Sequence, residues 1–108
     1  MDEGKGQDMR NPNFERLRGT LQAVRADLGA WNQKRWVSID KSCGCFIWHA
    51  VRLYGTPEQV AAVRWDTNGD RAGGEVLGLS SSRLLTISFA ENSLDDIEAI
   101  IDQWEASV

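Results

Sequence analysis

The residues best suited to chemistry lie close together in this chain, at Cys43, Cys45 and His49. Thiolate and imidazole groups are ligands that zinc prefers, and Asp40 is near enough in sequence to supply a fourth. A structural zinc site usually takes ligand pairs from two separate segments, and the sequence has no second Cys or His pair. We therefore interpret these residues as buried thiols and a core histidine, and expect neither a metal nor another cofactor.

The same residues could also form a thiol nucleophile. Cys45 and His49 are four residues apart, so one helix face would carry both, and the start of a helix lowers the pKa of a thiol. The run Cys-Gly-Cys-Phe is similar to the cysteine-protease motif Cys-Gly-Ser-Cys-Trp. Those enzymes take their histidine from far downstream, where this chain has none. A metal- or thiol-dependent enzyme centred on Cys43, Cys45 and His49 is thus the alternative to a non-enzymatic function.

A third group of residues could bind calcium. Asp66, Asn68 and Asp70 alternate as do the first ligands of an EF-hand loop. However, Arg71 replaces the glycine of that loop, and Leu77 replaces its bidentate glutamate. We prefer to interpret these residues as an Asx-rich turn between two helices.

The tryptophans are the strongest functional signal, since the chain of 108 residues contains five of them. Trp31 and Trp36 fall in a predicted loop together with Lys34 and Arg35. Aromatic and basic residues on one loop suit either protein binding or the closing of a small core. We predict that these four residues, together with Arg52, form a partner-binding surface.

The spacing of apolar residues predicts an all-α fold. We expect a single compact domain of five or six short helices over residues 12–108, behind a flexible polar tail over residues 1–11. The first helix is expected over residues 12–28, capped by Asn11. A central buried helix is expected over residues 43–54, because the sequence there is apolar almost all round.

Further helices are expected in the second half of the chain. Thr56-Pro57 begins a capping box, and a short helix is expected to follow it. The next helix is expected over residues 71–79. The segment after Ser80 would suit a helix or, by its alternation over residues 85–89, a strand, and we prefer the helix. Asn92-Ser93 is expected to cap a final acidic helix.

Composition argues against several classes of function. The longest uncharged apolar run is too short to cross a bilayer, and the N-terminus lacks the apolar region of a secretory signal. We therefore expect a cytoplasmic protein that does not enter membranes. A net charge of −4 also argues against nucleic-acid binding, which needs many basic contacts to phosphates.

The charge is unevenly distributed along the chain. Residues 1–54 contain nine basic and six acidic residues, whereas residues 55–108 contain three basic and ten acidic residues. Two solvated faces that differ in charge are the preferred explanation. The asymmetry could also orient a partner, or allow a homo-oligomer that assembles head to tail.

Short motifs follow one another in a fixed order between residues 30 and 104. They are Trp-x-Gln-x-x-Trp at Trp31, Gln33 and Trp36; Cys43-Gly44-Cys45 leading into a helix that ends near Gly55; Leu77-Gly78-Leu79; and Phe89 followed by Asn92-Ser93-Leu94. This pattern resembles a family of small uncharacterised proteins from actinobacteria and their phages. In that family the cysteines are several residues apart, whereas here one glycine separates them. The resemblance implies a cytoplasmic, phage-encoded helical protein, and we expect a protein-interaction module that binds or modulates a host protein.

Overall fold

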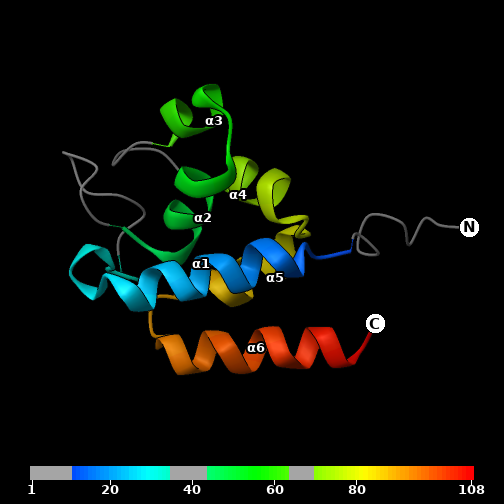
Figure 1. Cartoon of the computed structure of the whole chain (residues 1–108). Coiled ribbons are helices and arrows are strands. Elements are labelled where there is room, and N and C mark those ends of the chain that lie inside the picture. The colour runs from blue at the N-terminus through cyan, green and yellow to red at the C-terminus, as the bar shows by residue number, and fades with distance from the viewer. Residues whose placement is uncertain (1–10, 35–43, 64–69) are drawn as a thin grey trace, which may run out of the picture.

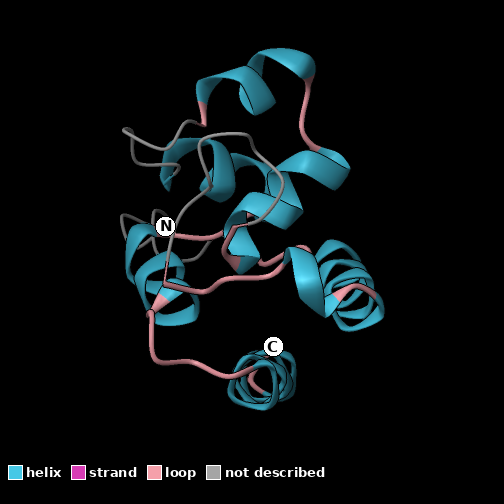
Figure 2. Cartoon of the chain, turned by 90° about the vertical axis from the view of Figure 1, so that its left-hand side faces the viewer, coloured by secondary structure: helices cyan, strands magenta, loops and turns pink. Residues whose placement is uncertain are grey.

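The computed structural model describes residues 11–34, 44–63 and 70–108, with Asp70 described by its backbone alone. The expected tail lies outside these residues, except for Asn11. Over the described residues the chain is helical, and the views in Figures 1 and 2 contain no strand. The elements are α1 (Phe14–Ala26), the 3-10 turn η2 (Leu28–Ala30), α2 (Phe46–Tyr54), α3 (Pro57–Ala62), α4 (Asp70–Leu77), α5 (Ser81–Ser88) and α6 (Leu94–Ala106). The prediction of a single compact all-α domain is confirmed.

Helix α2 is the centre of the molecule, as the sequence predicts. Its residues Phe46 to Val51 are all buried, and it packs against α1, α3, α4 and α5. The helix begins at Phe46, later than predicted, because Cys45 has the extended backbone of an N-cap. Trp48 of α2 is one of the largest fully buried side chains. The buried residues of α2 belong to the same hydrophobic cluster as those of the helices around it, and this cluster forms the core.

Most helix starts follow from local capping chemistry. Thr56 forms the predicted capping box at the start of α3, and the side chains of Ser80 and Ser93 cap α5 and α6. Helix α1 is also capped by a side chain, since Oδ1 of Asn13 accepts from the N–H of Arg16 at 3.1 Å, but the prediction that Asn11 is the N-cap is wrong. The backbone N–H of Asn13 also donates a hydrogen bond to the carbonyl oxygen of Leu77 at 2.8 Å, which ties the start of α1 to the end of α4.

The Leu77-Gly78-Leu79 motif has a backbone explanation. Gly78 ends α4 with a φ of 68°, in the left-handed region that favours glycine. A Cβ atom at this position would lie 2.7 Å from the backbone oxygen of Asn11. The glycine therefore permits both the turn after α4 and the close approach of the chain that enters α1.

Helix α6 runs antiparallel to α1 and lies along it (Figure 1). Two arginines seven residues apart on α1 each contact two carboxylates on α6, at distances of 2.6–2.9 Å from the arginine Nη2 atom. The pairs are Arg18 with Asp102 and Glu105, and Arg25 with Asp95 and Glu98. These contacts join the basic first half of the sequence to the acidic second half within one molecule.

Helix α6 also buries Ile97 and Ile101 against the core. Arg83 of α5 lies over the ring of Trp104, at 5.5 Å from its centroid, and gives α6 a second contact. Within the part of the chain that the structure describes, no helix is long and apolar enough to cross a membrane.

Candidate functional site

The segment before α2 is held by a buried glutamine. The Nε2 atom of Gln33 donates hydrogen bonds to the carbonyl oxygens of Ile87 at 2.9 Å and Phe89 at 3.2 Å. Its Oε1 atom accepts a hydrogen bond from the backbone N–H of Phe46 at 3.0 Å. Two carbonyls and one N–H fix the orientation of the amide. Gln33 therefore connects this segment to the start of α2 and the end of α5, a role that the sequence alone does not reveal.

A surface pocket of about 290 Å³ opens beside Gln33. Residues Trp31 to Lys34 form one part of its wall, and Ala90 to Ser93 form the other. Lys34 and Glu91 are exposed, so the pocket has one charge of each sign at its edge. Of the predicted partner-binding residues, Trp31 and Lys34 are thus brought together here, whereas Arg35 and Trp36 lie outside the described residues.

Trp31 has two roles in this structure. It lines the pocket, and it also packs against the hydrophobic core as a partly buried side chain. Its indole Nε1 is buried and has no hydrogen-bond partner among the described residues. In contrast to the indole, the backbone next to Trp31 is hydrogen-bonded, since the N–H of Asn32 donates to the carbonyl oxygen of Gly44 at 2.8 Å. Trp31 therefore helps to close the core while its surroundings form the pocket wall.

An exposed apolar pair lies on α5 and at its C-cap. The side chains of Leu85 and Phe89 are one helical turn apart, and these residues are 62% and 59% exposed. Phe89 directly precedes the pocket residue Ala90, and its carbonyl is held by Gln33. Neither residue was predicted to bind a partner, because the apolar sequence of α5 does not reveal which side chains face outward.

His49 is part of the core, and both of its ring nitrogens are engaged. Its Nε2 atom lies 2.7 Å from the carbonyl oxygen of Ala30, and its Nδ1 atom lies 3.2 Å from Nη2 of Arg52. Because a carbonyl only accepts and a guanidinium only donates, the ring is neutral and carries its proton on Nε2. Burial lowers the pKa of His49; the hydrogen bond to Ala30 opposes this shift, and the charge of Arg52 adds to it.

This arrangement bears on the candidate metal and thiol sites. A metal could bind His49 only if one of its two hydrogen bonds broke. Cys45 is buried at the N-cap of α2, and Cys43 lies outside the described residues. Across residues 11–34, 44–63 and 71–108, no three His, Cys, Asp or Glu side chains are grouped so as to hold a metal ion. Of the calcium candidates, Asp66 and Asn68 also lie outside the described residues, and Asp70 is the first residue of α4.

Arg52 was predicted to bind a partner, and here it has an intramolecular role. It is exposed on α2, and its guanidinium donates to His49. Its neighbour Tyr54, near the end of the same helix, lies under the guanidinium of Arg16, at 5.5 Å from the ring centroid. The contact of Arg52 with His49 lies within α2, whereas the contact of Tyr54 with Arg16 joins α2 to α1.

Comparison with known proteins places the chain in no established group. No protein-family model matches it, and neither a curated protein nor a solved structure does so. The resemblance to the actinobacterial and phage proteins therefore stays a prediction, and the function has to be argued from the geometry of the site.

We expect acidification to destabilise the protein through His49, the only histidine of the chain. Since its pKa is lower in the folded state than the ordinary value of 6.5, the unfolded state takes up a proton first. The contribution of neutral His49 to the free energy of unfolding is complete above the pKa of His49 in the unfolded state. It is lost as the pH falls toward the pKa of His49 in the folded state. The variant His49→Gln has an amide that could still donate to the Ala30 carbonyl. It should lose less stability than the wild type between about pH 7.5 and about pH 5.5. Urea unfolding across this range is the measurement, and equal losses in both proteins would contradict the prediction.

Proposed function

We propose that this protein is a protein-interaction module that binds or modulates a host protein. The binding surface would be the Lys34–Phe89 surface, formed by Trp31, Lys34, Leu85, Phe89 and Glu91. The observation that supports it best is the exposure of Leu85 and Phe89, at 62% and 59%, next to a pocket with a lysine at its edge. Neighbouring exposed apolar side chains often mark sites of protein interaction.

The chemistry of this surface suggests the chemistry of the partner. An apolar side chain of the partner would pack against Phe89 and Leu85 or enter the pocket, and a nearby carboxylate would pair with Lys34. Arg35 and Trp36, which lie outside the described residues, are proposed as further partner contacts from the sequence alone. The family resemblance adds the proposal that the protein is phage-encoded and meets its partner in the cytoplasm of an actinobacterial host.

Affinity capture from an actinobacterial lysate tests the proposal. Wild-type protein should retain a host protein that Lys34→Glu and Phe89→Ser fail to retain, because these changes reverse the charge or remove the apolar anchor. Leu53→Ser is the matched control, since Leu53 is exposed on α2 and takes no part in the pocket. Circular dichroism should show that all four proteins are folded.

Two outcomes would contradict the proposal. The surface is wrong if Phe89→Ser retains the host protein as well as the wild type does, or if Leu53→Ser loses it equally. The predicted contributions of Arg35 and Trp36 are tested by alanine at both positions. If that variant unfolds instead of folding without binding, these residues stabilise the core and do not contact the partner.

A further inference from the structure

The Lys34–Phe89 surface contains two charges of opposite sign that the fold leaves unused. Lys34 and Glu91 are both exposed, and they belong to opposite walls of the pocket of about 290 Å³. Among the described residues, neither of them forms an ion pair. The surface therefore presents one unpaired positive and one unpaired negative charge, one on each side of the pocket.

The apolar part of the same surface carries no charge that would repel a copy of itself. Leu85 and Phe89 are 62% and 59% exposed. The other exposed residues of α5 are uncharged; they are Ser81, Ser82 and Thr86. Two copies of this face could therefore approach each other without like-charge repulsion, and the burial of their apolar side chains would favour the contact.

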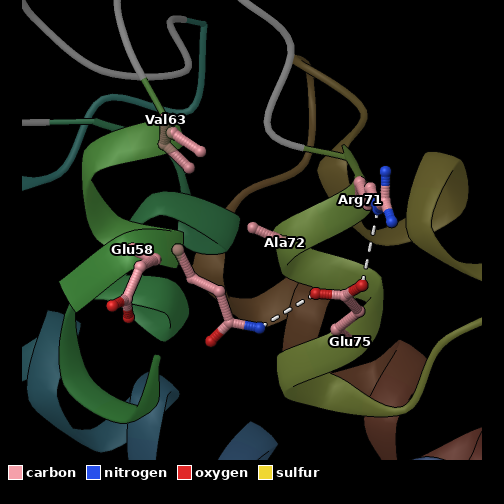
Figure 3. A pocket seen from close by; sticks show the side chains of 7 residues that line it. Glu58, Val63, Arg71, Ala72 and Glu75 are labelled. Atoms are coloured by element: carbon pink, nitrogen blue, oxygen red, sulfur yellow. Dashed lines mark hydrogen bonds and ion pairs between the residues drawn. The ribbon is translucent and has the colours of Figure 1, made fainter. Parts of the chain in front are cut away.

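A second pocket, of about 300 Å³ between α3 and α4, differs in this respect (Figure 3). At its edge, Glu75 accepts a hydrogen bond from Nε2 of Gln59 at 3.0 Å and lies 3.5 Å from Nε of Arg71. The carboxylate of Glu58, on the α3 side, is turned away from Glu75 (Figure 3). The two carboxylates thus do not converge, and the exposed Glu58 is a suitable control position outside the Lys34–Phe89 surface.

We propose that the Lys34–Phe89 surface also binds a second copy of this chain, in a dimer with two-fold symmetry. Such a dimer uses the same surface twice, so Lys34 of each copy would pair with Glu91 of the other. The two-fold axis would pass between these two residues, and Leu85 and Phe89 of the two copies would cover one another. A surface of five named residues is small beside the roughly 20–30 residues a side of a stable interface, so the dimer should be weak and reversible.

A reversible dimer would regulate access to the surface. A host protein would have to displace the second copy, because both would contact Lys34 and Phe89. This consequence rests on the proposed function, whereas the dimer itself does not.

The test is analytical ultracentrifugation of the purified full-length protein over a range of concentrations, in which the wild type should dimerise. Lys34→Glu and Glu91→Lys should each raise the dissociation constant of the dimer about tenfold, because each brings like charges together at two places. Phe89→Ser removes the apolar anchor and should remain monomeric. Glu58→Lys changes the net charge as Glu91→Lys does, and it should dimerise as the wild type does.

Mixing two variants tests the proposed pairs directly. A heterodimer of Lys34→Glu with Glu91→Lys has opposite charges at both places. Lys34→Glu, carrying a dye on its N-terminal amine, should therefore dimerise with Glu91→Lys as tightly as the wild type does with itself. Its heterodimer with Glu58→Lys keeps one like-charge pair and should be about threefold weaker. An ion pair within one copy could not be restored by mixing.

Three results would overturn the proposal. They are a wild type that stays monomeric up to about 1 mM, a Phe89→Ser variant that dimerises as the wild type does, and a mixture of Lys34→Glu with Glu91→Lys that forms no heterodimer. The proposed function fails separately. A monomeric protein that still captures a host protein would overturn the dimer alone, whereas a dimer that captures no host protein would overturn the proposed function alone.

Discussion

Replacing Gln33 by alanine is expected to lower the free energy of unfolding by about 2–4 kcal/mol. The carbonyls of Ile87 and Phe89 would each keep a donor, because Nδ2 and the backbone N–H of Asn92 also lie within hydrogen-bond distance of them. The buried N–H of Phe46 would lose the side-chain acceptor that the structure gives it. Most of the loss should therefore arise at the start of α2, together with the cavity left by the shortened side chain.

Urea unfolding of Gln33→Ala beside Gln22→Ala gives the measurement. Gln22 is an exposed glutamine on α1, so its substitution should change stability by less than about 0.5 kcal/mol. If the two variants unfold at the same urea concentration, Gln33 does not stabilise the fold as we argue.

The variant Gln33→Glu gives a second test, because its stability should depend on pH in a direction that can be predicted. At neutral pH, a carboxylate would face the carbonyl oxygens of Ile87 and Phe89, so this variant should be less stable than Gln33→Ala. Its folded pKa would be raised, which means that the folded state binds a proton more readily than the unfolded state. The destabilisation should therefore shrink as the pH is lowered from about 7 to about 5, where the protonated carboxyl can donate. If the loss of stability in Gln33→Glu does not change with pH, the prediction is wrong.

The second large effect is expected at Gly73, which lies in α4 against α2. A Cβ atom there would overlap Cγ2 of Ile47, and would lie 3.4 Å from Cδ1 of Leu84. Ile47 is fully buried, and its branched Cβ allows Cγ2 little movement. Gly73→Val should therefore cost roughly 1–3 kcal/mol, although replacing a glycine inside a helix is usually favourable.

Thermal and urea unfolding of matched variants checks the cause. Gly29→Ala is the control, since a Cβ at Gly29 meets only Oδ1 of Asp27, at 3.8 Å. Ile47→Ala removes the methyl group that a side chain at position 73 would meet. The double variant Ile47→Ala with Gly73→Val should lose at least about 1 kcal/mol less than the two single losses added together. Strict additivity would show that the two positions are not in steric conflict.

Where the fold was predictable, the information was local in the sequence. The capping box at Thr56 and the caps at Ser80 and Ser93 involve residues three apart, so a reader of the sequence can find them. The start of α1 was predicted wrongly because Asn11 and Asn13 are both good caps. In the structure the N–H of Asn13 donates a hydrogen bond to the carbonyl oxygen of Leu77, and a contact between such distant residues cannot be found from the local sequence.

The candidate site was predictable to a smaller extent, because it depends on contacts between distant segments. The aromatic and basic composition of the loop pointed to Trp31 and Lys34. The role of Gln33 could not be inferred, since its three partners are 13, 54 and 56 residues away. The exposure of Leu85 and Phe89 depends on which face of α5 meets the core, and the sequence offers apolar residues on both faces.

The pairing of α1 with α6 has a consequence for synthesis of the protein in the cell. The carboxylates that meet Arg18 and Arg25 lie 70 to 87 residues further along the chain. The first helix therefore leaves the ribosome long before the last helix can cover it. Its contacts with α2 and α4 can form earlier in translation, whereas α6 can add its own only after 70 to 87 further residues have been made. The nascent chain would thus pass through a stage in which the α6-facing side of the core is open to chaperones or to premature association.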